Sequence, residues 1–159
     1  NMLEISLLGK INKDEYCFAY NKDVFKKINI KPDSISSLEE IFKNPVILPT
    51  KNSKMRIYLE ELLKTKIIAS NPILELEDMS MLISYTIEGL GIGYIPKSIA
   101  LSKKELTIIS LEEKLYEENI HLIYNETVLT NSSKELIHIL MKEKCWLKIY
   151  TKVSLFLTL

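Results

Sequence analysis

The sequence has few of the residues that build metal centres, disulfide frameworks or glycine-rich loops. Its 159 residues include two cysteines, two histidines and four glycines. Cys17 and Cys145 form no CxxC pair, and together with His121 and His138 they give no zinc-binding spacing. We therefore expect no metal, no cofactor and no required disulfide, and we expect the chain to sit in a reducing compartment.

An excess of charge of one sign is also missing. The chain has 21 Lys and Arg residues and 21 Asp and Glu residues, so its formal net charge is zero. A free-standing nucleic-acid-binding domain carries a basic excess that neutralises phosphates. This balance largely excludes direct binding of nucleic acid by this segment.

Long apolar runs are absent too. No stretch approaches the ~20 apolar residues that cross a bilayer, and residues 1–4 do not resemble the start of a signal peptide. At 47% apolar residues, the chain is long enough to bury one core. We expect a cytoplasmic domain without membrane contact, and a start at Asn1 suggests a fragment.

What is present is an alternation of short apolar runs with helical periods. We expect strands at 5–8, 16–20, 46–48, 73–76, 92–95, 106–109 and 120–124, and helices at 36–44, 54 to about 64, 78–88, 97–101 and 131–143. Residues 45–96 thus read β-α-β-α-β. Helical crossovers of this kind join parallel strands, so the fold class is α/β.

The segment Gly89-Leu90-Gly91-Ile92-Gly93 looks like a nucleotide-binding loop, but its context differs. A dinucleotide fingerprint follows a strand and opens a helix, whereas these glycines close a helix and open a strand. We interpret Gly89 as a left-handed helix cap, followed by a strand that another group approaches closely.

Catalytic constellations are not recognisable. His121 lies in an apolar strand and His138 in the middle of a helix, and the adjacent glutamates at 112–113 and 117–118 have no apolar pocket signature. We expect no catalytic residues and no enzyme.

Two loops stand where an open α/β sheet binds ligands, beyond the carboxyl ends of strands. The first, Thr50–Ser53, opens a helix and offers hydroxyl, amide and backbone N–H groups that favour an anion. The second, Glu77–Ser80, contains Asp78. Asn52 or Ser53 is alternatively an ordinary N-cap, and both roles are compatible.

Arg56 is the only arginine and falls in the first turn of the helix after Thr50–Ser53. Its guanidinium can clamp a carboxylate through two bonds. The alternative is a salt bridge to a surface glutamate.

These motifs together resemble the effector-binding domain of LysR-type transcriptional regulators. Ile87–Pro96 resembles the recurring V-x-x-G-L-G-I-x-x-L-P segment of that family. Ser36–Phe42 before Asn44–Ile47 is similar to its s-l-x-x-L-x-x-x-P-x-I pattern, and Ser53–Arg56 to its s-x-x-R helix start. Residues 121–124, followed by 132–140, are similar to its return strand and closing helix.

The resemblance implies a periplasmic-binding-protein-like fold of type 2, in which two hinged lobes hold a small molecule. Residues 1–16 would be a remnant of the first lobe and the hinge, 17–118 the second lobe, and 119–144 a strand and helix returning to the first. Thr50, Asn52, Ser53, Arg56, Glu77, Asp78 and Ser80 would bind the effector. Residues 145–159 form an atypical apolar tail without a counterpart in the family.

The resemblance also implies partners. Such regulators form dimers or tetramers, and they bind DNA through a winged helix-turn-helix that this chain lacks. The leading hypothesis is therefore a bacterial regulator that senses a small, anionic effector. The alternative is a solute-binding protein of a transporter, which has the same two-lobe architecture.

Overall fold

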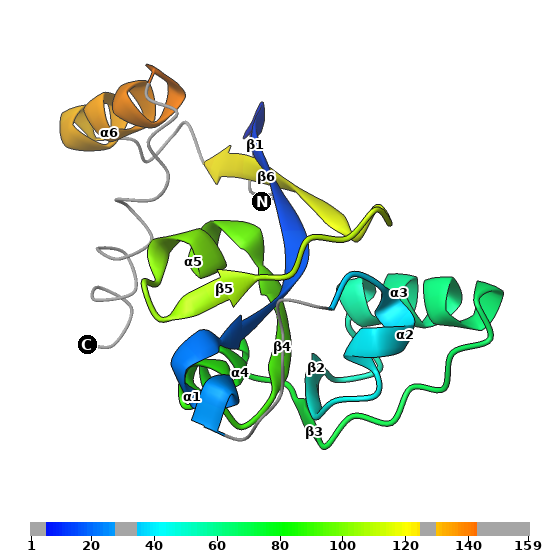
Figure 1. The fold of residues 1–159 in the computed structure, drawn as a ribbon. Helices are drawn as coiled ribbons and strands as arrows, with labels where there is room; N and C mark the ends of the chain where they lie inside the picture. The colour runs from blue at the N-terminus through cyan, green and yellow to red at the C-terminus, as the bar shows by residue number, and fades with distance from the viewer. Residues whose placement is uncertain (1–5, 28–34, 125–129, 143–159) are drawn as a thin grey trace. The chain divides into compact units, whose positions relative to one another are not determined.

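The computed structural model describes residues 6–27, 35–124 and 130–142. Its elements are mixed α/β, as the sequence predicts (Figure 1). In chain order they are β1 (Ser6–Asn21), α1 (Lys22–Lys27), α2 (Leu38–Ile41), β2 (Val46–Pro49), α3 (Lys54–Thr65), β3 (Leu74–Leu76), α4 (Met79–Ile87), β4 (Ile92–Pro96), α5 (Lys97–Ser102), β5 (Leu106–Ile108), β6 (Glu117–Tyr124) and α6 (Asn131–Lys142).

The contacts of the chain divide it into two compact units. One is residues 15–117, and the other combines residues 1–14 with residues 118–159. In the second unit β6 pairs with β1. The candidate site concerns the unit 15–117 alone. The apolar tail 145–159 and Cys145 lie outside the described residues.

The sheet of the unit 15–117 has the strand order β3-β2-β4-β1-β5. β2 pairs in parallel with both β3 and β4, as the β-α-β-α-β pattern predicts. β1 runs antiparallel to β4 and β5, with Tyr16 opposite Pro96 and Ala19 opposite Ile108. The carboxyl ends of β2, β3, β4 and β5 therefore share one edge of the sheet, where β1 enters the unit.

Helices cover both faces of this sheet (Figure 1). In β1, Phe18 and Tyr20 pack with α2 and α3 on one face, while Cys17 and Ala19 pack with α4 and α5 on the other. Side chains alternate between the two faces along a strand, so one run of buried residues serves two cores. The near-continuous apolar runs of the sequence follow from this arrangement.

Two features near the start of the chain were not predicted. The strands expected at 5–8 and 16–20 are one strand, β1, and the helix α1 was not expected. The polar residues 12–15 break the apolar pattern, but they belong to the same extended strand. In α1, Asn21 Oδ1 accepts hydrogen bonds from the backbone N–H groups of Asp23 and Val24, at 3.1 and 3.3 Å. That is an N-cap signal which the sequence does contain.

The glycine segment behaves as predicted. Gly89 has a φ of 76° and follows the end of α4. A Cβ on Gly91 would lie 2.8 Å from the carbonyl oxygen of Pro45, and one on Gly93 would overlap the hydroxyl of Thr86. These glycines allow α4 and β2 to pack closely on β4.

None of the helices among the described residues combines the length and the hydropathy that a membrane crossing requires.

Candidate functional site

The two loops expected at the site are adjacent. Pro49 at the end of β2 pairs with Leu76 at the end of β3, and the backbone N–H of Thr50 donates to the carbonyl of Leu76 over 3.1 Å. Thr50 is half-buried, whereas Asn52 and Glu77 are exposed. The structure thus brings the Thr50–Ser53 loop beside the Glu77–Ser80 loop.

The first turn of α3 lacks a side-chain cap. Ser53 occupies the N-cap position, but its hydroxyl donates to the carbonyl of Thr50 over 2.8 Å and accepts nothing from the helix. Among the residues that the structure describes, the backbone N–H groups of Lys54, Met55 and Arg56 have no protein acceptor. Such N–H groups, together with the helix dipole, attract a negatively charged group.

The first turn of α4, unlike that of α3, has a side-chain cap. Asp78 Oδ1 accepts from the backbone N–H groups of Ser80 and Met81, at 2.7 and 3.4 Å, and from the Ser80 hydroxyl at 2.5 Å. These bonds, the one from the Ser80 hydroxyl above all, hold the pKa of the Asp78 carboxyl below its ordinary value. Asp78 is therefore the N-cap of its own helix, and its carboxylate is ionised at neutral pH.

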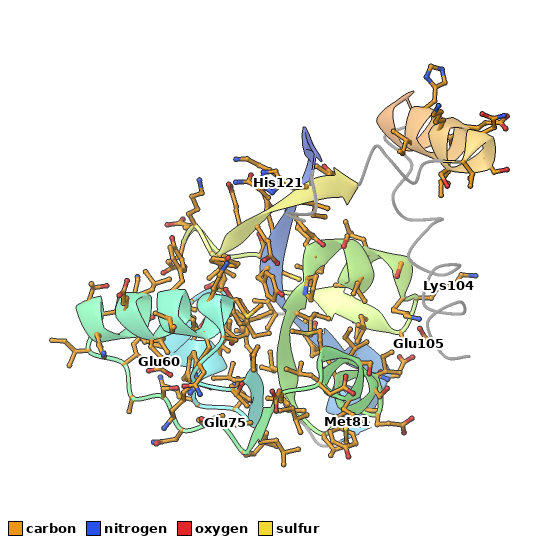
Figure 2. All side chains as sticks on the ribbon, turned by 180° about the vertical axis from the view of Figure 1, so that it is seen from behind. Glu60, Glu75, Met81, Lys104, Glu105 and His121 are labelled. Carbon is orange, nitrogen blue, oxygen red and sulfur yellow. The ribbon has the colours of Figure 1, made fainter. Side chains whose placement is uncertain are left out.

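Arg56 lies beneath the first loop and is fully buried. Its Nη1 donates to the carbonyl of Pro49 over 3.0 Å, and its Nε lies 2.7 Å from Glu60 Oε1. Its Nη2 reaches Ser70 Oγ at 3.2 Å and Glu75 Oε1 at 3.1 Å. Figure 2 shows Glu60 on α3 and Glu75 on β3.

Of the two roles considered for Arg56, the structure contains the salt bridge. Its partners Glu60 and Glu75 are each about a quarter to a third exposed, at 26% and 33%. Burial opposes the ionisation of Glu60, but hydrogen bonds from Ser70 and Arg56 outweigh it and lower the pKa of Glu60. The guanidinium ties the end of β2 to α3 and β3, directly below the Thr50–Ser53 loop.

A third strand end at the same edge escaped the sequence reasoning. β4 ends at Pro96, and α5 begins at once with Lys97, whose Nζ lies 2.7 Å from Glu15 Oε2. The rule applied to the ends of β2 and β3 would have found it. Both histidines, His121 and His138, are exposed. No group of three or more His, Cys, Asp or Glu residues suitable for a metal occurs among the described residues.

A family model described as the LysR substrate binding domain matches residues 31–144 of the chain. Among solved structures, the chain is similar to the Synechocystis PCC6803 CcmR regulatory domain in complex with 2-PG, with a TM-score of 0.61 and 14% identity. The alignment covers 89% of this chain and 67% of that one.

The effector-binding domain of QuiR in complex with shikimate gives a TM-score of 0.58 and 17% identity, over 89% of this chain and 66% of that one. DarR of Vibrio fischeri in complex with DNA gives a TM-score of 0.60 and 18% identity, over 87% of this chain and 45% of that one. The chain thus spans about two thirds of these regulatory domains and less than half of that regulator.

A search of curated protein sequences finds no match. The likeness to the solved structures shows the periplasmic-binding-protein-like fold of type 2, and the family is one of transcriptional regulators that bind small effectors. The match also decides between the two classes of protein considered, a transcriptional regulator and a solute-binding protein of a transporter. The chain belongs to the LysR substrate-binding-domain family.

Proposed function

We propose that the chain is the effector-sensing part of a cytoplasmic, DNA-binding regulator and that it binds a small anion at the Thr50–Ser53 loop. The observation that carries the proposal is the uncapped first turn of α3, at the shared carboxyl edge of the parallel strands. Lys51 and Lys54 are exposed beside these N–H groups and add positive charge. Shikimate, the anion of a carboxylic acid, and a bromide ion are bound by two structurally similar regulators.

The other residues of the site take different roles in this proposal. Thr50, Asn52 and Ser53 contact the effector, and Glu77, Asp78 and Ser80 form the acidic wall opposite. The acidic wall disfavours a second negative charge at that side, so the anion is oriented with its neutral or donor groups toward Glu77. Arg56 is a positioning residue, because its guanidinium is already held by Pro49, Glu60, Ser70 and Glu75.

Further proposals concern the whole protein. Residues 17–118 form most of one lobe, and residues 119–144 return a strand and a helix to the other. A winged helix-turn-helix outside this chain binds DNA, and the protein self-associates as a dimer or tetramer. An effector that favours one arrangement of the lobes then shifts the DNA-bound state by its difference in affinity for the two arrangements.

The site is tested by a thermal-shift screen of the full-length protein against carboxylates, phosphates, sugars and amino acids. An effector at a hundredfold excess over its Kd stabilises the folded state by about 2.7 kcal/mol. Thr50→Val removes a hydroxyl that has no hydrogen bond to any residue the structure describes, and it keeps the shape of the side chain. We expect this variant to fold normally and to bind the effector about tenfold more weakly, the loss of roughly one hydrogen bond to a charged group.

Thr65→Val is the matched control. Thr65 ends the same helix, and its hydroxyl donates to the carbonyl of Leu62 over 2.7 Å, far from the first turn. We expect it to bind the effector like the original protein. Equal affinity of the Thr50→Val variant, or an equal loss in both variants, would remove the Thr50–Ser53 loop from the site.

A further inference from the structure

A pocket of about 310 Å³ opens in the unit 15–117 at the edge where β4 and β5 end. It shares no lining residue with the Thr50–Ser53 and Glu77–Ser80 loops. Its volume lies at the lower limit of small-molecule sites, which span about 300–1,000 Å³. The pocket is therefore of a size for a metabolite of a few heavy atoms.

Apolar residues and charged residues of both signs line the pocket. The lining residues Tyr16, Cys17 and Ile109 are buried, and the lining residues Leu111 and Leu115 are half-buried. Lys97 pairs with Glu15, with 2.7 Å between Nζ and Oε2, and Lys114 pairs with Glu117, with 3.2 Å between Nζ and Oε1. A ligand in this pocket meets an ammonium and a carboxylate at each of two places. A third carboxylate of the lining, that of Glu113, is paired with Lys66 over 2.6 Å.

The pairs of Lys97 with Glu15 and of Lys114 with Glu117 are weak enough to exchange partners. The side chains of Lys97 and Glu15 are 45% and 50% exposed, and those of Lys114 and Glu117 are 73% and 23% exposed. Ion pairs at such exposure contribute about 0.2–1 kcal/mol each. A ligand whose own charges replace these ion pairs therefore loses little free energy by breaking them.

The paired charges select the ligand. A simple anion that takes Lys97 leaves the Glu15 carboxylate without its cation, and a simple cation leaves Lys97 without its anion. A ligand that carries a carboxylate and an ammonium a few bonds apart satisfies both members of a pair at once. We propose that this pocket binds a zwitterion with a short apolar side chain, the chemistry of a free α-amino acid, at a site separate from the Thr50–Ser53 loop.

The test is isothermal titration of the full-length protein with the free amino acids, each at neutral pH. The matched probes for alanine are propionate, which lacks the ammonium, and ethylamine, which lacks the carboxylate. We expect at least one amino acid to bind, and its matched carboxylate and amine to bind at least tenfold more weakly. No binding by any amino acid, or equal binding by a matched carboxylate, would overturn the proposal.

The double variant Lys97→Met/Glu15→Gln locates the site. It removes one charge of each sign, so the net charge is unchanged. Its control is Lys104→Met/Glu105→Gln, in the exposed turn between α5 and β5, outside the pocket lining (Figure 2). We expect the first variant to lose at least tenfold in affinity and the control to lose none.

The two variants distinguish failure of the pocket proposal from failure of the proposed function. Thr50→Val should leave amino-acid binding unchanged, and Lys97→Met/Glu15→Gln should leave binding of the anionic effector unchanged. An amino acid whose binding is lost in Thr50→Val and kept in Lys97→Met/Glu15→Gln occupies the α3 loop, which would overturn the pocket proposal and leave the proposed function standing.

Discussion

Arg56 is the side chain on which the shape of the candidate site depends most. It is fully buried, yet it bonds groups from β2, β3 and α3. Burying a guanidinium is favourable only when its donors are paired, because an unpaired buried charge loses its hydration. The single arginine of the chain therefore stands where the fixed fork of donors is needed, and a lysine would reach fewer of these acceptors.

We expect Arg56→Met to lower the free energy of unfolding by about 3 kcal/mol, since it leaves the Pro49 carbonyl and two carboxylates without their shared donor. Arg56→Lys keeps the charge but not the fork, and should cost roughly half as much. Urea unfolding followed by circular dichroism measures both. A methionine variant as stable as the original protein would mean that the guanidinium does not hold the site together.

The sequence predicts the place of Arg56 but not its burial. Its position in the first turn of α3 is evident from the helical period, whereas its acceptors come from residues 49, 60, 70 and 75. Three of these lie outside the helix, and only the folded sheet brings them together. The pattern offers Asn52 or Ser53 as the N-cap of α3. The structure places Ser53 at that position, but the direction of its hydroxyl bond depends on the loop geometry.

At the level of elements, α3 connects the candidate loop to the segment before β6. Its Tyr58 hydroxyl donates to the carbonyl of Lys114 over 3.1 Å, and Lys66, just after the helix, lies 2.6 Å from Glu113 Oε1. The hydrogen bond from Lys66, which outweighs the effect of burial, holds the pKa of Glu113 below its ordinary value. α3 is thus held in place at its first turn by the bonds of Arg56 and at its end by the ion pair of Lys66 with Glu113.

The ion pair of Glu113 with Lys66 predicts that the stability of the folded protein depends on pH. A carboxyl whose pKa is lowered on folding adds stability that is present above its unfolded pKa of about 4.3 and lost as the pH falls through the folded value. We expect Glu113→Gln to be less stable by at most about 1 kcal/mol at pH 7, because Lys66 is partly exposed. Near pH 3 the two proteins should be equally stable.

Urea unfolding at pH 7, 5 and 3 checks this expectation. Glu112→Gln is the control, because Glu112 is exposed and has no ion pair among the described residues. A stability difference for Glu113→Gln that stays the same at all three pH values would contradict the role of its ionised form.

Most elements could be predicted because their signals are local. The Asp78 start of α4 and the Gly89 stop are confirmed. The N-cap of α2 is Ser37, whose Oγ accepts from the backbone N–H of Glu40 at 3.3 Å, one residue after the helix start expected at Ser36. β1 could not be predicted as one strand, because its partners β4, β5 and β6 are distant in the sequence. In α3, Leu59 and Leu63 are buried, whereas Tyr58 is 38% exposed and its hydroxyl donates to the carbonyl of Lys114.

For the whole molecule, the family and the strand topology both indicate a binding site at the edge of the sheet where β2, β3 and β4 end. The parallel order of β2, β3 and β4 places three loops together, and the chain belongs to a family of effector-binding domains. The order of short motifs along the chain was sufficient to predict the family, since each motif corresponds to a turn or cap that the fold requires. The identity of the effector depends on the chemistry of exposed side chains, which no such requirement determines.

The most direct test of the central claim is hydrogen–deuterium exchange of the full-length protein with and without an effector found by the thermal-shift screen. Because the N–H groups of residues 54–56 lack protein acceptors, they should exchange readily in the free protein and slow when an anion binds. We predict the strongest protection in peptides covering residues 50–56, with weaker protection at 77–80. Protection confined to other segments, with residues 50–56 unchanged, would contradict the account.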